Sequence, residues 1–306
     1  MKVKLDFCDF WPGYNKTGNF FHKLLSERFE VEICDQPDFL IFADRGRHLH
    51  RVHNCVKIYF CTENFAPDFK SYDYAFTCRQ MPDPRNLRMP YYALYNPAAL
   101  LKHRENPEQI LAAKSKFCAL LTSYDNKSTR LRTGFFHKLC RYQKVDSGGK
   151  ALNNLGFQVP PGAAAKMEFL RPYKFNLAFE NSSVPGYTSE KIVEAMQTRA
   201  MPIYWGNPEV AAEFNPKSFL NYADFPSEEA LIEKIIELDR DDAKYLEYLR
   251  QPYFHHDQPN EFFNRERLLD QFEKIFTTPI TPVSTRRHFL QVGRWIPVRK
   301  NLPVKR

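Results

Sequence analysis

A glutamate and a lysine stand together where a predicted strand leads through a loop into a predicted helix. The strand covers 175–179, the helix covers 188–199, and the first turn of the helix carries Glu190 and Lys191. The free N–H groups and the dipole of a helix start favour an anion, and the lysine adds a full positive charge. The pattern therefore indicates an anion site. The alternative is that Lys191 points to water and pairs with Glu194.

The elements that must position these residues alternate between strand and helix along the whole chain. Apolar runs predict strands over 3–7, 29–34, 38–42, 56–61, 74–77, 117–122, 175–179 and 201–205. Helical spacing predicts helices over 15–28, 129–142, 188–199, 209–214, 227–239, 245–249 and 261–276. Such alternation is typical of parallel sheets covered by helices, which bind ligands at the carboxyl ends of their strands. We therefore expect two α/β halves with a site in the crevice between them.

The positive charge of the chain is concentrated at its carboxyl end. The 306 residues carry a formal net charge of +8, and 278–306 hold seven Lys and Arg and no acidic residue, which leaves about +1 for 1–277. A nearly neutral body argues against a nucleic-acid-binding protein, which remains a distant alternative. The basic tail fits either contact with an anionic membrane surface or a solvated terminus.

The cysteines and the start of the chain indicate a reducing compartment. There are seven cysteines, an odd number without C-x-x-C spacing, which is typical of thiols rather than of disulfides or a zinc site. The sequence opens as a strand without a signal-peptide core, and it has no apolar run of the length that spans a membrane. We expect a cytoplasmic protein, which the basic tail would place peripherally at the inner face of the membrane. Removal of an N-terminal anchor stays an alternative.

Several motifs together resemble the signature of the α1,3/4-fucosyltransferase family. In the second half they are Tyr173-Lys-Phe-Asn-Leu-Ala-Phe-Glu-Asn-Ser, Gly186-Tyr-Thr-Ser-Glu-Lys-Ile, Pro202-Ile-Tyr-Trp-Gly and Phe214-Asn-Pro-Lys-Ser-Phe. In the first half, Phe60-Cys-Thr-Glu-Asn is similar to the F-x-T/G-E-N segment of the family. Arg132-x-x-Phe-Phe fits the start of its donor domain, so the resemblance covers residues 55–225.

The resemblance implies an α/β protein of the GT-B fold, with two Rossmann-like domains that face each other across a cleft. We place an acceptor-side domain at 1–115, a GDP-fucose-binding domain at 116–277, whose last helix could pack back on the first domain, and the basic tail at 278–306. The implied reaction moves L-fucose with inversion to a β-galactosyl-GlcNAc-type glycan and gives Lewis-type products. The GlcNAc O3 is favoured, and the linkage, 1,3 or 1,4, stays open. The alternative is a GT-B transferase that uses another sugar nucleotide.

The resemblance also implies roles on the donor side. Arg132 and Lys191 match cations that bind the diphosphate, and Asn181, Tyr187 and Glu190 match further donor contacts. A carboxylate such as Glu190 also suits a transition state with oxocarbenium character. A helix start with two cations can replace a metal ion at the leaving group, and no D-x-D stands in a suitable loop. We therefore expect no required cofactor and no metal site.

On the acceptor side, Glu63 matches the general base of the family. The alternative is that Glu63 and Asn64 only cap the segment that follows a strand. Trp11 and Tyr14, with Asn64, are weaker candidates for contacts with acceptor sugars, because aromatic faces stack on pyranose rings. Packing in the core explains the two aromatic residues equally well.

Overall fold

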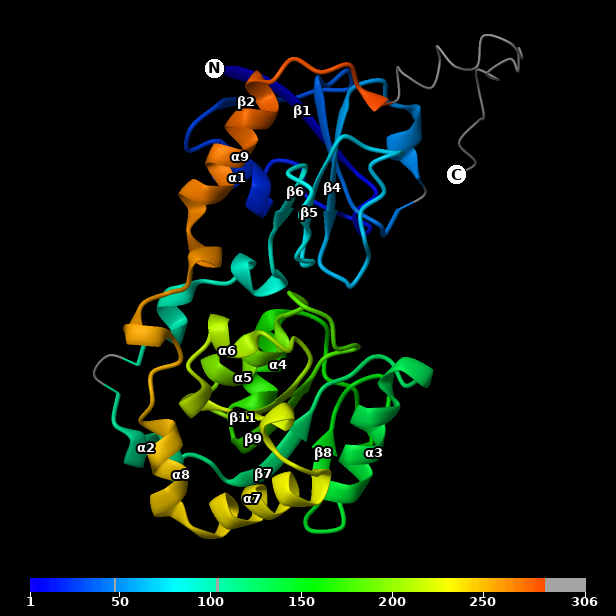
Figure 1. The fold of residues 1–306 in the computed structure, drawn as a ribbon. Helices are drawn as coiled ribbons and strands as arrows, with labels where there is room; N and C mark the ends of the chain where they lie inside the picture. The colour runs from blue at the N-terminus through cyan, green and yellow to red at the C-terminus, as the bar shows by residue number, and fades with distance from the viewer. Residues whose placement is uncertain (47, 103–104, 284–306) are drawn as a thin grey trace.

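The computed structural model describes residues 1–46, 48–102 and 105–283, which form two α/β domains stacked end to end (Figure 1). Each domain is built on a parallel sheet, of six strands in the first and five in the second. This confirms the predicted fold class. The expected membrane contact of the basic tail falls largely in 284–306, outside the described residues.

The first sheet has the strand order β2-β1-β3-β4-β5-β6. Its strands are β1 (Lys2–Cys8), β2 (Glu30–Ile33), β3 (Phe39–Phe42), β4 (Val56–Cys61), β5 (Tyr74–Thr77) and β6 (Asn86–Arg88). All six residues of β4 are buried, because both faces of the sheet are covered. Ile58 and Phe60 join the large core on one face, whereas Tyr59 and Cys61 point to a smaller cluster on the other.

The second sheet has the order β11-β10-β9-β7-β8. Its strands are β7 (Lys116–Leu120), β8 (Val145–Ser147), β9 (Tyr173–Phe179), β10 (Met201–Trp205) and β11 (Leu220–Asn221). The helices of the described chain are α1 (Phe20–Leu25), α2 (Pro107–Ala112), α3 (Arg130–Leu139), α4 (Ala163–Leu170), α5 (Lys191–Gln197), α6 (Val210–Glu213), α7 (Glu228–Arg240), α8 (Asp242–Leu249) and α9 (Arg265–Thr277). The sequence predicted β4, β5 and β10 to the residue and missed β6, β8, β11 and α4.

Helix α9 leaves the second domain and packs on the first. Figure 1 shows it beside α1, far from the helices that precede it in the sequence. Its apolar stripe enters the first core, where Phe272 stacks on Phe76 with ring centroids 4.6 Å apart. On the outside, Arg28 pairs with Asp270 and Glu273, each at 2.8 Å. The chain therefore crosses between the domains twice, first between β6 and β7 and again before α9.

Helix α7 begins as the sequence predicted, whereas α5 does not. The side chain of Ser227 accepts a hydrogen bond from the N–H of Ala230 at 3.2 Å and caps α7. The helix expected over 188–199 starts only at Lys191, so its predicted start was wrong. The reason is that the N–H and the hydroxyl of Ser189 both donate to the buried carboxylate of Glu180.

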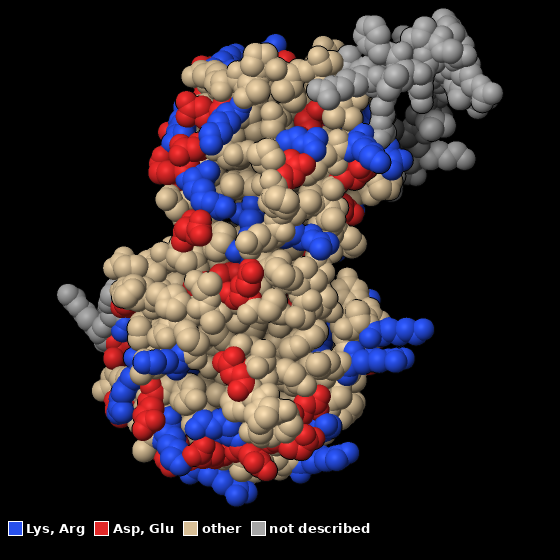
Figure 2. All heavy atoms as spheres, viewed as in Figure 1, with Lys and Arg blue, Asp and Glu red and all other residues tan. Residues whose placement is uncertain are grey.

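Acidic and basic side chains are interleaved on the outer rim of the second domain. Figure 2 shows red and blue groups alternating where Figure 1 places α7 and α8. Lys138 pairs there with Glu228 at 2.7 Å, and Lys234 with Glu237 at 2.8 Å. Within the described ranges, no helix is long and apolar enough to cross a membrane. All seven cysteines are free thiols.

Polar contacts across the domain boundary hold the two domains against each other. Arg88, at the end of β6, donates to the carbonyl oxygen of Gly186 at 2.8 Å and pairs with the buried Glu213. Asn64 donates to the hydroxyl of Ser182 at 2.9 Å. These contacts join the loops that follow strands of opposite sheets, so they fix how the strand ends face each other.

Gly186 lies where the backbones of the two domains approach each other closely. Its φ of +85° is one that side chains rarely adopt, and an added Cβ would lie 2.8 Å from both the Arg88 Nε and the Cys78 carbonyl oxygen. The loop therefore needs glycine here both for its backbone conformation and for the contact between domains.

We predict that Gly186→Ala destabilises the protein and loosens the contact between domains. Gly156→Ala is the matched control, because Gly156 has a similar φ of +76° but open space around the added Cβ. The control should lose roughly 1–2 kcal/mol in the free energy of unfolding for the positive φ alone. Gly186→Ala should lose roughly 1–3 kcal/mol more, because the neighbouring backbone must shift. Denaturant unfolding measures both, and equal losses would show that the close approach carries no energy.

Candidate active site

A cavity of about 600 Å³ lies where the two domains meet. Loops that follow the carboxyl ends of strands in both sheets line it, as expected for parallel α/β domains. The first domain contributes Trp11, Arg45, Phe60, Thr62, Glu63, Tyr91 and Leu94. The second contributes residues of the segments 121–124, 148–150, 158–162 and 181–194, together with Lys166.

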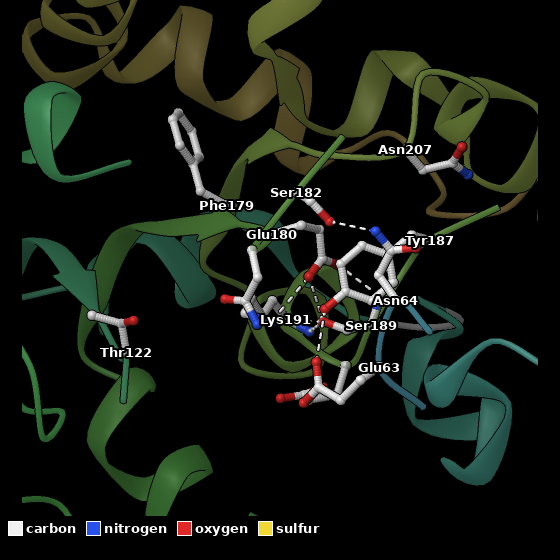
Figure 3. A network of polar contacts seen from close by, with 12 residues as sticks. Glu63, Asn64, Thr122, Phe179, Glu180, Ser182, Tyr187, Ser189, Lys191 and Asn207 are labelled. Atoms are coloured by element: carbon white, nitrogen blue, oxygen red, sulfur yellow. Dashed lines mark hydrogen bonds and ion pairs between the residues drawn. The ribbon is translucent and has the colours of Figure 1, made fainter. Parts of the chain in front are cut away.

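Glu63 reaches this cavity from the loop after β4. One carboxylate oxygen accepts from the Tyr187 hydroxyl of the second domain at 3.1 Å (Figure 3). The other lies 3.2 Å from the Arg45 guanidinium. The Glu63 side chain keeps 32% of its surface exposed. A carboxylate that is held from both sides yet still open to the cavity is placed to accept a proton from a bound hydroxyl.

Lys191 lies on the opposite wall, above a buried carboxylate. Its ammonium contacts Glu180 Oε2 at 3.0 Å and the Ser189 hydroxyl at 2.9 Å (Figure 3). Burial alone would lower the pKa of Lys191, but the carboxylates of Glu180 and Glu190 raise it, so the amine stays charged. Glu180 is fully buried, and burial raises its pKa. The charge of Lys191 offsets part of this rise.

Glu190 and Glu194 follow each other by one turn and share a lysine. Lys166, from α4, lies 2.9 Å from Glu194 Oε1 and 3.6 Å from Glu190 Oε1. Tyr95 of the first domain donates to Glu194 at 2.8 Å. Burial opposes ionisation of Glu190, yet the charges of Lys191 and Lys166 bring its pKa below the ordinary value. Glu190 is thus an ionised carboxylate on the cavity wall.

Arg132 lies under the site rather than on its surface. The side chain is 1% exposed, and its guanidinium donates to the Tyr124 carbonyl at 2.6 Å, to Asn181 Oδ1 at 3.0 Å and to the Phe179 carbonyl at 3.3 Å. Its Nε has no partner among the described residues. Arg132 is absent from the cavity lining, whereas Asn181 and Tyr124 line it. The predicted contact of Arg132 with a diphosphate would require this buried side chain to become accessible from the cavity.

The three weak acceptor-side candidates lie in different environments. Trp11 is 57% exposed and lines the cavity. Tyr14 stacks on Phe10 with ring centroids 3.9 Å apart and belongs to the packed edge of the first core. Asn64 bonds Ser182 across the boundary between domains and does not line the cavity. The cavity therefore brings together Trp11 and Glu63, with Tyr14 and Asn64 behind them.

Four charged residues of this site were not predicted from the sequence. Arg45, Lys150 and Lys166 line the cavity, and Glu180 supports Lys191 from below. Their positions after or near predicted strands are a weak indication of a site in the sequence. Their pairing with residues far along the chain leaves no pattern in the sequence. In the described part of the chain, no three His, Cys, Asp or Glu side chains are grouped as metal ligands would be.

Gly148 and Gly149 bring the backbone close to the edge of the cavity. An added Cβ on Gly149 would lie 2.1 Å from the Thr122 carbonyl oxygen, and one on Gly148 would lie 2.7 Å from Val159. Packing on the loop after β7 thus explains Gly149, and packing on Val159 explains Gly148. Both contacts shape the wall that holds Lys150.

Two parallel-sheet domains with a shared cavity at their strand ends define a GT-B-type sugar-nucleotide transferase fold. Residues 111–269 match the family described as glycosyltransferase family 10 (fucosyltransferase), C-terminal part, and residues 5–95 match the alpha-(1,3)-fucosyltransferase FucT N-terminal domain. The chain belongs to glycosyltransferase family 10, as its motifs predicted.

Known relatives and a solved structure agree with this assignment. The chain is 30% identical to the alpha-(1,3)-fucosyltransferase FucT of Helicobacter pylori, over 78% of this chain and 58% of that protein. It is 35% identical to human 4-galactosyl-N-acetylglucosaminide 3-alpha-L-fucosyltransferase FUT6, over 47% of this chain and 39% of that protein. A crystal structure of an alpha1,3-fucosyltransferase with GDP-fucose superposes with a TM-score of 0.73 at 26% identity, covering 91% of this chain and 92% of that one. The chain thus spans 58% of the length of the Helicobacter pylori protein and 39% of the length of the human protein.

We predict that Lys191→Met destabilises the protein by about 3–5 kcal/mol, because the buried Glu180 loses its partner. The fold raises the pKa of Glu180 above its ordinary value of 4.5. At a pH above that ordinary value, ionisation of Glu180 therefore lowers the free energy of unfolding. Without the lysine charge that cost increases, and the loss in the variant should grow between pH 5 and pH 8. Denaturant unfolding across this range measures it.

The double variant Lys191→Met/Glu180→Gln is the control. It keeps the shape of the pair without a buried charge, so it should regain part of the lost stability and lose the additional pH dependence. A Lys191→Met loss that does not change with pH would contradict the role of Glu180.

Proposed function

We propose that the protein transfers L-fucose from GDP-fucose to the GlcNAc O3 of an N-acetyllactosamine-type glycan, with inversion at the anomeric carbon. The observation that carries the proposal is that Glu63 and Lys191 face one cavity from opposite domains. An inverting transfer needs a base on one side of the reacting carbon and a stabilised leaving group on the other. Membership in family 10 and the GDP-fucose in the similar crystal structure support the choice of donor.

In the proposed reaction, the acceptor hydroxyl gives its proton to Glu63 while its oxygen forms a bond to C1 of fucose. The bond between C1 and the β-phosphate oxygen breaks at the same time, and GDP leaves on the face opposite the acceptor. Lys191 stands where it would offset the charge of the leaving diphosphate, with Arg132 behind it. Glu190 would stabilise positive charge that develops on the sugar ring.

The name of the human relative supports the choice of acceptor, because it describes transfer to a 4-galactosyl-N-acetylglucosaminide. We propose that the galactose and GlcNAc rings lie on the first-domain side of the cavity, with Trp11 as a stacking surface. We also propose that no metal ion is required, since the Lys191, Lys166 and Lys150 ammonium groups line the cavity. The seven free thiols favour a cytoplasmic enzyme.

An assay of donor and linkage tests the function as a whole. The full chain is incubated in EDTA with GDP-fucose, GDP-mannose or a UDP-sugar, and with N-acetyllactosamine or its β1,3-linked isomer. We expect turnover only with GDP-fucose, and NMR of the product should show an α1,3-linked fucose on GlcNAc. Turnover only with another donor would support the alternative, a GT-B transferase of different donor specificity.

We predict that Glu63→Gln lowers the transfer rate by about 10²–10⁴-fold, the usual contribution of a general base. The glutamine keeps the hydrogen bonds to Tyr187 and Arg45 in part but cannot take the proton. GDP affinity, measured by calorimetry, should be unchanged because the donor lies on the other wall. Glu209→Gln, on the exposed surface away from the cavity, is the matched control and should be fully active. Equal turnover in Glu63→Gln would remove Glu63 as the base.

A further inference from the structure

A second cavity of about 660 Å³ lies within the first domain. It opens on the face of the first sheet opposite α1 and α9, where Phe42, Tyr59 and Tyr72 form a small aromatic cluster. Residues 42–44, 48 and 50–54 form its wall together with residues around Asp68, and a short 3-10 helix at Leu49–Val52 carries part of it. The proposed reaction uses none of these residues.

One buried aspartate fixes the wall between the two cavities. Asp9 has a φ of +58°, and its carboxylate accepts from the N–H groups of Leu49 and His50, each at 2.9 Å, and contacts His50 Nδ1 at 2.6 Å. Its carbonyl accepts from the N–H of Arg45 at 2.9 Å. The same residue thus orients His50 toward the second cavity and Arg45 toward the first.

His50 presents an uncharged ring to the second cavity. Its ring stacks on Phe42 with centroids 4.2 Å apart, and burial lowers its pKa although Asp9 opposes the shift. The Nδ1 proton is directed to Asp9, which leaves Nε2 as an acceptor for a ligand hydroxyl.

The lining suits a neutral ligand with many hydroxyl groups. Two carboxylates, Asp44 and Asp68, balance two cations, Arg51 and Lys57. Aromatic rings and the 80% exposed Val52 offer apolar faces beside these polar groups. A phosphate or nucleotide would meet both carboxylates, whereas a pyranose matches alternating polar and apolar contacts.

The second cavity adjoins the site of the proposed reaction. Asp44 lines the second cavity and its neighbour Arg45 lines the first, where Arg45 lies 3.2 Å from Glu63. A linear glycan whose reacting hydroxyl lies at Glu63 would continue past Arg45 toward the second cavity.

We propose that this cavity is a saccharide subsite that binds the further sugars of an extended acceptor, beyond the disaccharide that reacts. The proposal rests on the proposed function for its ligand class. The subsite would make the enzyme select long glycan chains over isolated disaccharides through contacts remote from the reacting carbon.

The test compares N-acetyllactosamine with a linear tetrasaccharide of two such units. Affinity is measured by NMR of the histidine rings without donor, and kcat/KM is measured with GDP-fucose. We expect the tetrasaccharide to bind about tenfold more tightly, a difference of the size that one or two hydrogen bonds give. The same preference should appear in kcat/KM.

Two variants remove the subsite by different means, and both alter the surface of the wall rather than a core. His53→Ala deletes a lining side chain, and Val52→Trp covers the mouth with a ring at an exposed position. Both should bind the disaccharide as before and lose the preference for the tetrasaccharide. His137→Ala, on the exposed side of α3 and outside both cavities, is the control and should keep it.

Equal affinity of the unmodified protein for the two glycans, or an unchanged preference in both variants, would overturn the proposal. Perturbation of the His50 and His53 signals by inorganic phosphate but not by glycan would overturn it as well, in favour of an anion site. Glycan binding without transfer of fucose to any acceptor would overturn the proposed function and leave the saccharide subsite standing, so the two failures are distinguishable.

Discussion

The proposed donor side of the site depends on the carboxylate of Glu180, which is fully buried at the end of β9. This carboxylate accepts two hydrogen bonds from Ser189 and one from Lys191. The backbone N–H of Glu180 donates to the Trp205 carbonyl oxygen of β10 at 2.7 Å. A buried carboxylate is tolerated only where such partners compensate its lost hydration. The loop between β9 and α5 is therefore folded around one charge, and the place of Lys191 on the cavity wall follows from it.

The sequence predicted helices and strands well where the pattern of apolar residues determines them. The strands at Val56–Cys61, Tyr74–Thr77 and Met201–Trp205 were predicted to the residue, because buried parallel strands are continuous apolar runs. The start of α5 could not be predicted in this way. Ser189 is a good cap by local rules, but its N–H and hydroxyl are held by Glu180, nine positions earlier, and its oxygen accepts from the Lys191 N–H only at 3.4 Å. The contact with Glu180 exists only in the folded loop.

The candidate site was predictable where a motif carried it and unpredictable where charges pair over long distances. Glu63, Lys191 and Glu190 were found by resemblance, and the structure places them around one cavity. Lys166 pairs with Glu194 from 28 positions away, and no local pattern marks such a partner. The burial of Arg132 was equally hidden, because its partners are mostly backbone carbonyl oxygens, which every residue carries.

The same loop of the second domain takes part both in the site and in the contact between the domains. Glu63 comes from one sheet and Lys191 from the other, and the Tyr187 hydroxyl that reaches Glu63 lies in the loop whose Gly186 carbonyl binds Arg88. One of the bonds between the domains is thus one residue away from the bond that orients the proposed base. A movement that separated Arg88 from Gly186 would therefore also act on the contact between Tyr187 and Glu63.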